Sequence, residues 1–130
     1  MAEPERPARR RSWTVEQANA ALPWVSEALA RVQALLAAAR RERRQAAGRV
    51  EGNGHAVAAG GTELRAAVEA LDEAGIVLRD LEAGLVDFPA RLPDGREYLL
   101  CWVLGEPEVA FWHWPEAGYA GRRPLTDPPA

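Results

Sequence analysis

Apolar residues in the first third of the chain recur at alternating steps of three and four, which places them along one stripe of a helix. The stripe consists of Val15, Ala18, Leu22, Val25, Leu29, Val32, Leu36 and Ala39. This heptad pattern predicts a helix that packs against a second helix. Thr14 and Gln17 match a capping box at its start. Because the ring of Pro23 would clash with the carbonyl four residues earlier, we expect a short helix at about 14–21 and a longer one from Pro23 to about Ala47.

A second apolar series with the same spacing follows a loop-like segment. Its members are Leu64, Val68, Leu71, Gly75 and Leu78. Residues 52–61, GNGHAVAAGG, have the composition of a loop, and Thr62 is suited to cap the helix that follows. Two heptad-patterned helices joined by a loop predict an antiparallel helical hairpin, with coiled-coil packing, over about residues 14–75.

The composition changes at about residue 76, where Val, Leu, Phe, Tyr and Trp become frequent and turn dipeptides interrupt them. Asp94-Gly95 is a strong signal for a two-residue hairpin turn, and Gly105-Glu106 marks a second turn. We expect strands at about 84–91, 96–104 and 108–114, and a short fourth strand near 76–81. The predicted fold class is therefore α+β, with a helical hairpin followed by a three- to four-stranded antiparallel meander over about 76–114. Residues 115–125 form a C-terminal strap.

Length and composition fit one domain in the cytoplasm. The 130 residues suit a single domain over about 13–125, and the Pro-rich ends, residues 1–12 and 126–130, are expected to be disordered. No run approaches the ~18 apolar residues of a membrane span, and no signal peptide is evident. Cys101 is the single cysteine, which rules out an internal disulfide and favours a reducing compartment. We therefore expect a cytoplasmic protein without membrane contact.

Charge is distributed unevenly along the chain. The net charge of −3 argues against a general nucleic-acid binder, although residues 1–49 are basic and the remainder is acidic. The most basic stretch is RRERRQAAGR, Arg40–Arg49. Cations are favourable at the C-terminal end of a helix, which accounts for this stretch without a ligand. Contact with nucleic acid through this helix end is the alternative.

Candidate chemistry is concentrated in the predicted sheet and its loops. The residues are His55, Asp87, Cys101, Glu106, Glu108, His113 and Glu116. With the expected turns, position 87 faces 102 and position 98 faces 113, and facing residues share a side of the sheet. This register separates Asp87 from His113 by roughly 13 Å along the strands and puts Cys101 on the opposite face. It therefore predicts against a metal centre of these three residues, a conclusion that a one-residue slip would reverse.

The ligand site that remains is centred on His113. Its candidate residues are Tyr98, Glu106, His113, Glu116 and Arg122. A divalent metal at His113 and Glu116 is the alternative to a hydrogen-bonded, half-buried histidine, and no cofactor is predicted. The motifs G-x-S-x-G, H-E-x-x-H and C-x-x-C are absent, so the sequence leans against an enzyme, and an enzyme centred on His113 stays a variant of the ligand-binding alternative.

Apolar side chains on both predicted faces of the sheet indicate that both faces are covered. The helices would cover one face, and a partner, the C-terminal segment or a ligand would cover the other. Together with the heptads and the opposed charges of the two halves, this predicts self-association, most simply as a homodimer. The candidate interface residues are Val25, Leu29, Val32, Leu36, Trp112 and Trp114.

Five stretches spread over about residues 13–125 carry a family resemblance. They are WTVEQANAALPWV, NGH, GIVLRDLEAGLVDFPA, GREYLLCWVLGEPEVAFWH and GYAGRRPL. In this order they resemble a bacterial and archaeal family of small cytosolic proteins, domain of unknown function 2203. The resemblance implies a helical segment followed by a compact β-containing half, and no established activity. Its motif falls on Asp87, Trp102, Gly105, Glu106, Trp112, His113, Gly118, Gly121 and Arg122, with Tyr119 where Phe is expected.

Three functions follow as expectations. The first is a non-enzymatic, self-associating interaction domain. The alternative is a small-ligand or metal-binding domain centred on His113. The third is nucleic-acid contact through Arg40–Arg49.

Overall fold

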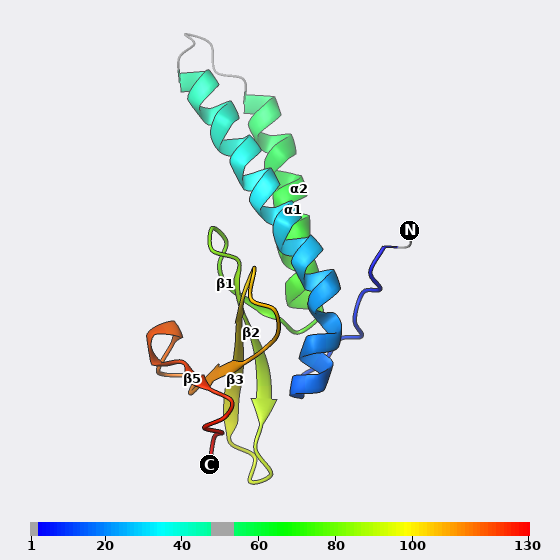
Figure 1. Cartoon of the computed structure of the whole chain (residues 1–130). Helices are drawn as coiled ribbons and strands as arrows, with labels where there is room; N and C mark the ends of the chain where they lie inside the picture. Colours follow the sequence, from blue (N-terminus) through cyan, green and yellow to red (C-terminus); the bar gives the residue numbers. More distant parts are fainter. Residues whose placement is uncertain (1–2, 48–53) are drawn as a thin grey trace.

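The computed structural model describes residues 3–47 and 54–130, and there it consists of two helices and a five-stranded antiparallel sheet (Figure 1). The helices are α1 (Val15–Ala47) and α2 (Gly54–Glu73). The strands are β1 (Val77–Asp80), β2 (Leu85–Arg91), β3 (Glu97–Val103), β4 (Phe111–His113) and β5 (Arg123–Pro124), and a 3-10 helix, η1 (Tyr119–Gly121), precedes β5. The α+β class is confirmed, and the strap supplies a fifth strand that the sequence does not predict.

Helix α1 runs without interruption through Pro23, where the sequence predicts a break. Pro23 is exposed, whereas Leu22 and Val25 beside it are buried. Packing of both flanking segments against the core therefore holds the helix together despite the lost hydrogen-bond donor. The capping box is confirmed, because Gln17 N–H donates to Thr14 Oγ1 at 3.1 Å and Thr14 N–H donates to Gln17 Oε1 at 3.0 Å.

Helix α2 begins at Gly54, well before the expected cap at Thr62, so His55 belongs to a helix and not to a loop. Alanine is the best helix former, and the alanines of this segment together with α1 alongside it favour the longer helix. The predicted end of the first helix at Gly48 lies outside the described residues. The two helices lie side by side and extend beyond the sheet (Figure 1). Neither described helix combines the length and hydropathy needed to cross a bilayer.

Both central hairpins are shifted by one residue from the predicted register. Asp87 pairs with Cys101 between β2 and β3, and Leu99 pairs with His113 between β3 and β4. The turn dipeptides instead predict position 87 opposite 102 and position 98 opposite 113. Since neighbouring side chains in a strand point to opposite faces, the shift exchanges the faces of β3 relative to the other two strands.

The β2–β3 loop explains the first shift. It spans residues 92–96 and is closed by two hydrogen bonds, from Gly95 N–H to the Leu92 carbonyl at 2.8 Å and from Leu92 N–H to the Arg96 carbonyl at 2.9 Å. The Asp94 carboxylate accepts the Arg96 N–H at 3.0 Å. Asp94-Gly95 therefore lies inside a longer loop and is not itself a two-residue turn.

One face of the sheet packs against the helices and forms the core. Its sheet residues are Val86, Phe88, Ala90, Leu100, Trp102 and Trp112. They meet Trp13, Leu22, Val25, Leu29 and Leu71. The Trp13 and Phe88 rings meet edge to face with centroids 5.2 Å apart. The intervening sheet residues point away from the helices, so this packing determines which side chains are left for the other face.

Both ends of the chain contact the folded domain, although the sequence predicts disordered tails. The backbone N–H of Arg10 donates to the Ala74 carbonyl at 3.2 Å. At the other end, Trp112 Nε1 donates to the Asp127 carbonyl at 2.7 Å. The two segments that the composition marks as tails therefore supply hydrogen-bond partners for polar groups of the folded domain, the Ala74 carbonyl and the Trp112 indole N–H.

Gly75 lies where the N-terminal segment crosses the chain, and its replacement by alanine is expected to be costly. Its φ is 86°, and a Cβ there would lie 2.0 Å from the Arg10 carbonyl oxygen. We expect Gly75→Ala to reduce the unfolding free energy by about 2–4 kcal/mol, from backbone strain plus displacement of the segment. Gly95→Ala is the control, because Gly95 has a similar φ of 92° but open space around it. If urea unfolding showed the same loss of unfolding free energy for Gly75→Ala and Gly95→Ala, the close approach of Arg10 to Gly75 would contribute nothing to the cost.

Candidate functional site

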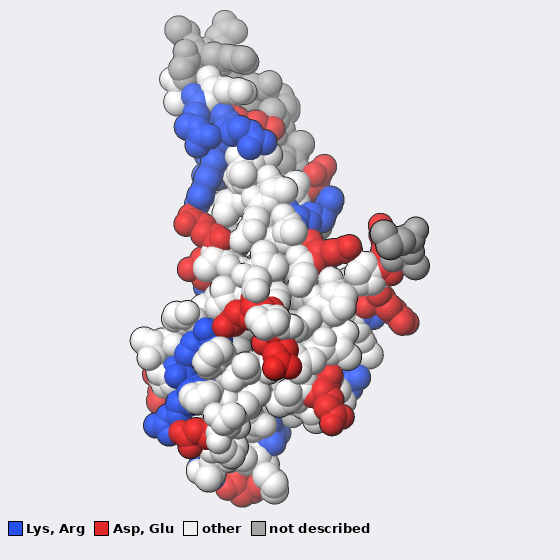
Figure 2. All heavy atoms as spheres, viewed as in Figure 1, with Lys and Arg blue, Asp and Glu red and all other residues white. Residues whose placement is uncertain are grey.

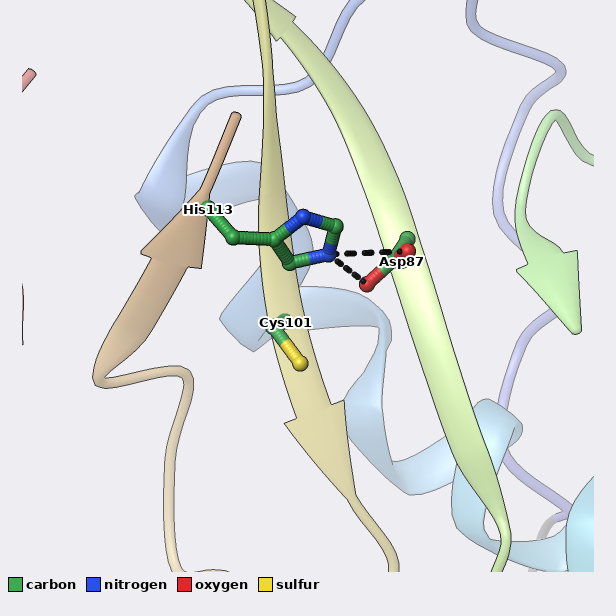
Figure 3. A group of neighbouring side chains, drawn as sticks. All are labelled: Asp87, Cys101 and His113. Atoms are coloured by element: carbon green, nitrogen blue, oxygen red, sulfur yellow. Dashed lines mark hydrogen bonds and ion pairs between the residues drawn. The ribbon is translucent and has the colours of Figure 1, made fainter. Parts of the chain in front are cut away.

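The face of the sheet turned away from the helices carries a buried group of three side chains (Figure 3). Asp87 comes from the middle of β2, Cys101 from the position paired with it on β3, and His113 from the end of β4. Their exposed fractions are 1%, 0% and 2%. One potential ligand atom of each residue lies within 4.8 Å of the other two. The predicted separation of these residues is therefore wrong, and the one-residue shift of the hairpins is the reason.

Both ring nitrogens of His113 face hydrogen-bond acceptors. Nδ1 lies 2.7 Å from the carbonyl oxygen of Trp114, which only accepts, so Nδ1 carries a proton. Nε2 lies 3.1 Å from each carboxylate oxygen of Asp87. Two lone pairs cannot face each other at this distance without a positive centre between them. Either a proton or a metal cation must therefore join Nε2 to the carboxylate.

Asp87 has a second cationic partner in Arg79 of β1. Arg79 Nε donates to Asp87 Oδ2 at 2.8 Å, and the Arg79 side chain is 47% exposed. A hydrogen bond of this kind orients a carboxylate, as the outer partners of metal ligands do. It also fits a buried ion pair that needs no metal. Sequence reasoning missed Arg79, because its proximity to Asp87 depends on the pairing of β1 with β2.

The thiol of Cys101 is strongly affected by its surroundings. Burial raises its pKa from 9.0 to about 12, and the negative charge of Asp87 adds to this rise. In the metal-free protein the thiol therefore remains protonated and unreactive at neutral pH. A bound metal ion would reverse this, because a coordinating thiol loses its proton.

A small cavity of about 160 Å³ lies over the three side chains. It is lined by Arg79, Leu85, Asp87, Cys101, His113, Pro115, Gly118 and Tyr119. Pro115, Gly118 and Tyr119 come from the strap, which forms one wall of the cavity. A larger groove of about 610 Å³ lies between the N-terminal segment and the helices, but no residue of the buried group lines it. The small cavity is thus the one that adjoins the chemistry.

Arg122 and Glu106 tie the strap to the sheet beside this cavity. Arg122 Nη2 lies 2.9 and 3.1 Å from the two carboxylate oxygens of Glu106, which also accepts the Val103 N–H at 2.7 Å. The guanidinium carbon lies 3.8 Å from the centroid of the Phe111 ring. Burial, the largest single influence, lowers the pKa of Arg122, but the hydrogen bond to Glu106 and the further interactions with Cys101, Tyr119 and Glu106 together outweigh it and raise that pKa. Arg122 is therefore already paired with Glu106, and its role as a ligand-binding residue remains a prediction.

The remaining predicted ligand residues do not join His113. Tyr98 contacts Trp112 on the helix-facing side of the sheet, with ring centroids 6.2 Å apart. Glu116 and Glu108 are exposed, and neither lines the cavity. The expected metal pair of His113 and Glu116 is thus replaced by His113 with Asp87 and Cys101.

Most of the predicted interface side chains lie inside the chain. Val25, Leu29 and Val32 are fully buried, and Trp112 is 1% exposed. Leu36 and Trp114 are partly exposed. Self-association remains a prediction, and of the six predicted side chains Leu36 and Trp114 are the ones accessible to a partner.

The arginine-rich stretch covers the outer part of α1 (Figure 2). Arg40 forms an ion pair with Glu82 in the β1–β2 turn. Arg41, Arg43 and Arg44 are exposed, and Arg49 lies outside the described residues. The stretch is therefore partly neutralised by the chain itself, and nucleic-acid contact remains a prediction.

Comparison with known proteins identifies one family. The family model described as "Uncharacterized conserved protein (DUF2203)" matches residues 11–125, which include every residue of the buried group and the cavity. No curated protein and no solved structure matches the chain.

Proposed function

The chain belongs to the DUF2203 family, and because that family's description states no activity, we propose a function from the geometry of the buried group. The protein binds one divalent transition-metal ion through the Asp87 carboxylate, the Cys101 thiolate and His113 Nε2. The observation that carries this proposal is the orientation of His113, whose Nδ1 proton is held by the Trp114 carbonyl. That hydrogen bond directs the Nε2 lone pair toward the other two ligands, as in established metal sites.

The distances suit a small tetrahedral ion. Metal bonds of about 2.0–2.2 Å to nitrogen and oxygen separate two ligands of a tetrahedral centre by roughly 3.3 Å. His113 Nε2 and the Asp87 oxygens are 3.1 Å apart, and Cys101 Sγ lies within 4.8 Å of both residues' ligand atoms. Only small side-chain shifts would bring all three ligands to one ion.

The donor set selects the class of metal. Imidazole nitrogen and thiolate sulfur favour zinc and related ions, whereas magnesium and calcium prefer oxygen ligands. Three protein ligands leave the fourth tetrahedral position for water or a ligand, which distinguishes this arrangement from closed structural zinc sites. Because the cavity adjoins the group, that fourth position has room for a ligand.

Cobalt(II) substitution tests the proposal. Untagged protein that has been treated with chelator should bind one cobalt ion per chain. The spectrum should show the visible bands of a tetrahedral site and a thiolate-to-cobalt band in the near ultraviolet. We expect His113→Ala to weaken binding by at least about 100-fold, because losing an outer partner alone costs about 10–100-fold. Cys101→Ser should remove the thiolate band.

His55→Ala is the matched control, because His55 is the other histidine of the chain and belongs to α2, whereas the three proposed ligands come from the sheet. It should bind cobalt as the wild type does. A folded wild-type protein that binds neither cobalt nor zinc in excess would overturn the proposal. The group would then be an Arg79–Asp87–His113 ion-pair network.

A further inference from the structure

We propose that the cavity over the metal centre binds a small monocarboxylate, with one carboxylate oxygen on the metal and the other on the outer N–H groups of Arg79. This inference rests on the proposed metal function. Arg79 donates its Nε–H to Asp87 at 2.8 Å, and this hydrogen bond fixes the guanidinium at the edge of the cavity. Its outer N–H groups can then donate to the oxygen of a ligand carboxylate that the metal does not hold.

The size of the cavity limits the ligand. A volume of about 160 Å³ equals roughly five water molecules at ~30 Å³ each. Pockets for larger organic ligands measure about 300–1,000 Å³. The space therefore suits a carboxylate with a short carbon chain and excludes a nucleotide.

The charges around the cavity favour a single negative charge. A divalent ion would be neutralised by the Asp87 carboxylate and the Cys101 thiolate, with neutral His113 as the third ligand. Arg79 would then leave one positive charge, because Arg122 is neutralised by Glu106. A monoanion would complete the balance beside the buried side chains of Asp87, Cys101 and His113.

The rest of the lining is uncharged and suits the carbon end of such a ligand. It consists of Leu85 of β2 and of Pro115, Gly118 and Tyr119 of the strap. Tyr119 is 52% exposed, so this part of the lining is open to solvent. None of these four residues carries a negative charge that would repel the carboxylate of the ligand.

Acetate is the probe, and the visible absorption of the bound cobalt shows whether acetate binds. Titration of the cobalt-loaded wild type with acetate at constant ionic strength should shift the visible cobalt bands with saturation. Arg79→Gln is the test variant, because Gln Nε2 occupies the position of Arg Nε and can still donate to Asp87. We expect it to keep its cobalt and to bind acetate about 10–100-fold more weakly, the range for a lost hydrogen bond to a charged group. Arg91→Gln, the same change elsewhere in the sheet, should behave as the wild type does.

Inorganic phosphate, a different anion, and methylammonium, a cation of similar size to acetate, are titrated into the cobalt-loaded protein in the same way for comparison. A response to acetate that weakens in Arg79→Gln alone supports the inference. A response to phosphate without acetate would overturn the assignment to a monocarboxylate. Equal acetate binding by wild type and Arg79→Gln would overturn the role of Arg79. Bound cobalt that no anion perturbs would overturn the inference and leave the metal function standing, whereas absence of cobalt binding would remove both.

Discussion

The variant Asp87→Ala is expected to lose about 3–5 kcal/mol of unfolding free energy in the metal-free protein, the usual cost of removing one partner of a buried ion pair. Asp87 is 1% exposed, accepts a hydrogen bond from Arg79 Nε and lies 3.1 Å from His113 Nε2. Its removal leaves His113 Nε2 buried without a partner. Because small domains are stable by only about 5–15 kcal/mol, this loss would bring the protein close to unfolding.

Urea unfolding after chelator treatment measures this loss. Asp87→Asn is the matched variant, because it keeps the shape and one acceptor oxygen while removing the charge. It should fall between the wild type and Asp87→Ala. A loss below about 1 kcal/mol for Asp87→Ala would match an exposed ion pair and would contradict the buried geometry.

The second large effect is expected at the Glu106–Arg122 pair. The two side chains are 25% and 13% exposed, so the pair is largely shielded from water. We expect Glu106→Leu and Arg122→Leu each to reduce the unfolding free energy by about 2–4 kcal/mol, because each leaves a shielded charge alone. The double variant should lose clearly less than the sum, since replacing both charges with apolar groups removes the unpaired partner.

A double-mutant cycle in urea measures this coupling. Glu106→Gln serves as the control, because the amide oxygen still accepts the Val103 N–H that Glu106 binds at 2.7 Å. The difference between Glu106→Gln and Glu106→Leu then separates the backbone hydrogen bond from the charge. Strict additivity of the single variants would show that the pair is not coupled, and the strap would have to be held by other contacts.

The helical part of the fold was largely predictable because it depends on local patterns. The capping box at Thr14 and the buried stripe through Val25 and Leu29 follow from short-range spacing, and both are confirmed. The break at Pro23 was a wrong prediction. Local sterics argue for a break, but the side chains on both sides pack into the core, and tertiary packing outweighs the local cost.

The candidate site was harder to predict because it depends on register. The residues Asp87, Cys101 and His113 were all recognised as candidates, yet the two turn signals set Asp87 and His113 roughly 13 Å apart on one face and put Cys101 on the other. The Asp94-Gly95 dipeptide fits a two-residue turn and also a longer loop. Because both faces of the strands are apolar, the strand residues do not show which of the two loops forms. Loop closure through Leu92 and Arg96 settles the register, and it is visible only in three dimensions.

The two ends of the sheet have a consequence for how copies of the chain can meet. The outermost strand beside β4 is β5, which has two residues, and one of them, Pro124, has no N–H to offer. The opposite edge is the four-residue β1, whose pairing with β2 is already irregular between Leu78 and Asp80. Short, irregular or proline-containing edges are how sheets avoid joining one another. The sheet is therefore a poor template for strand addition or fibre growth, and association of two copies would have to use a surface other than these two edges.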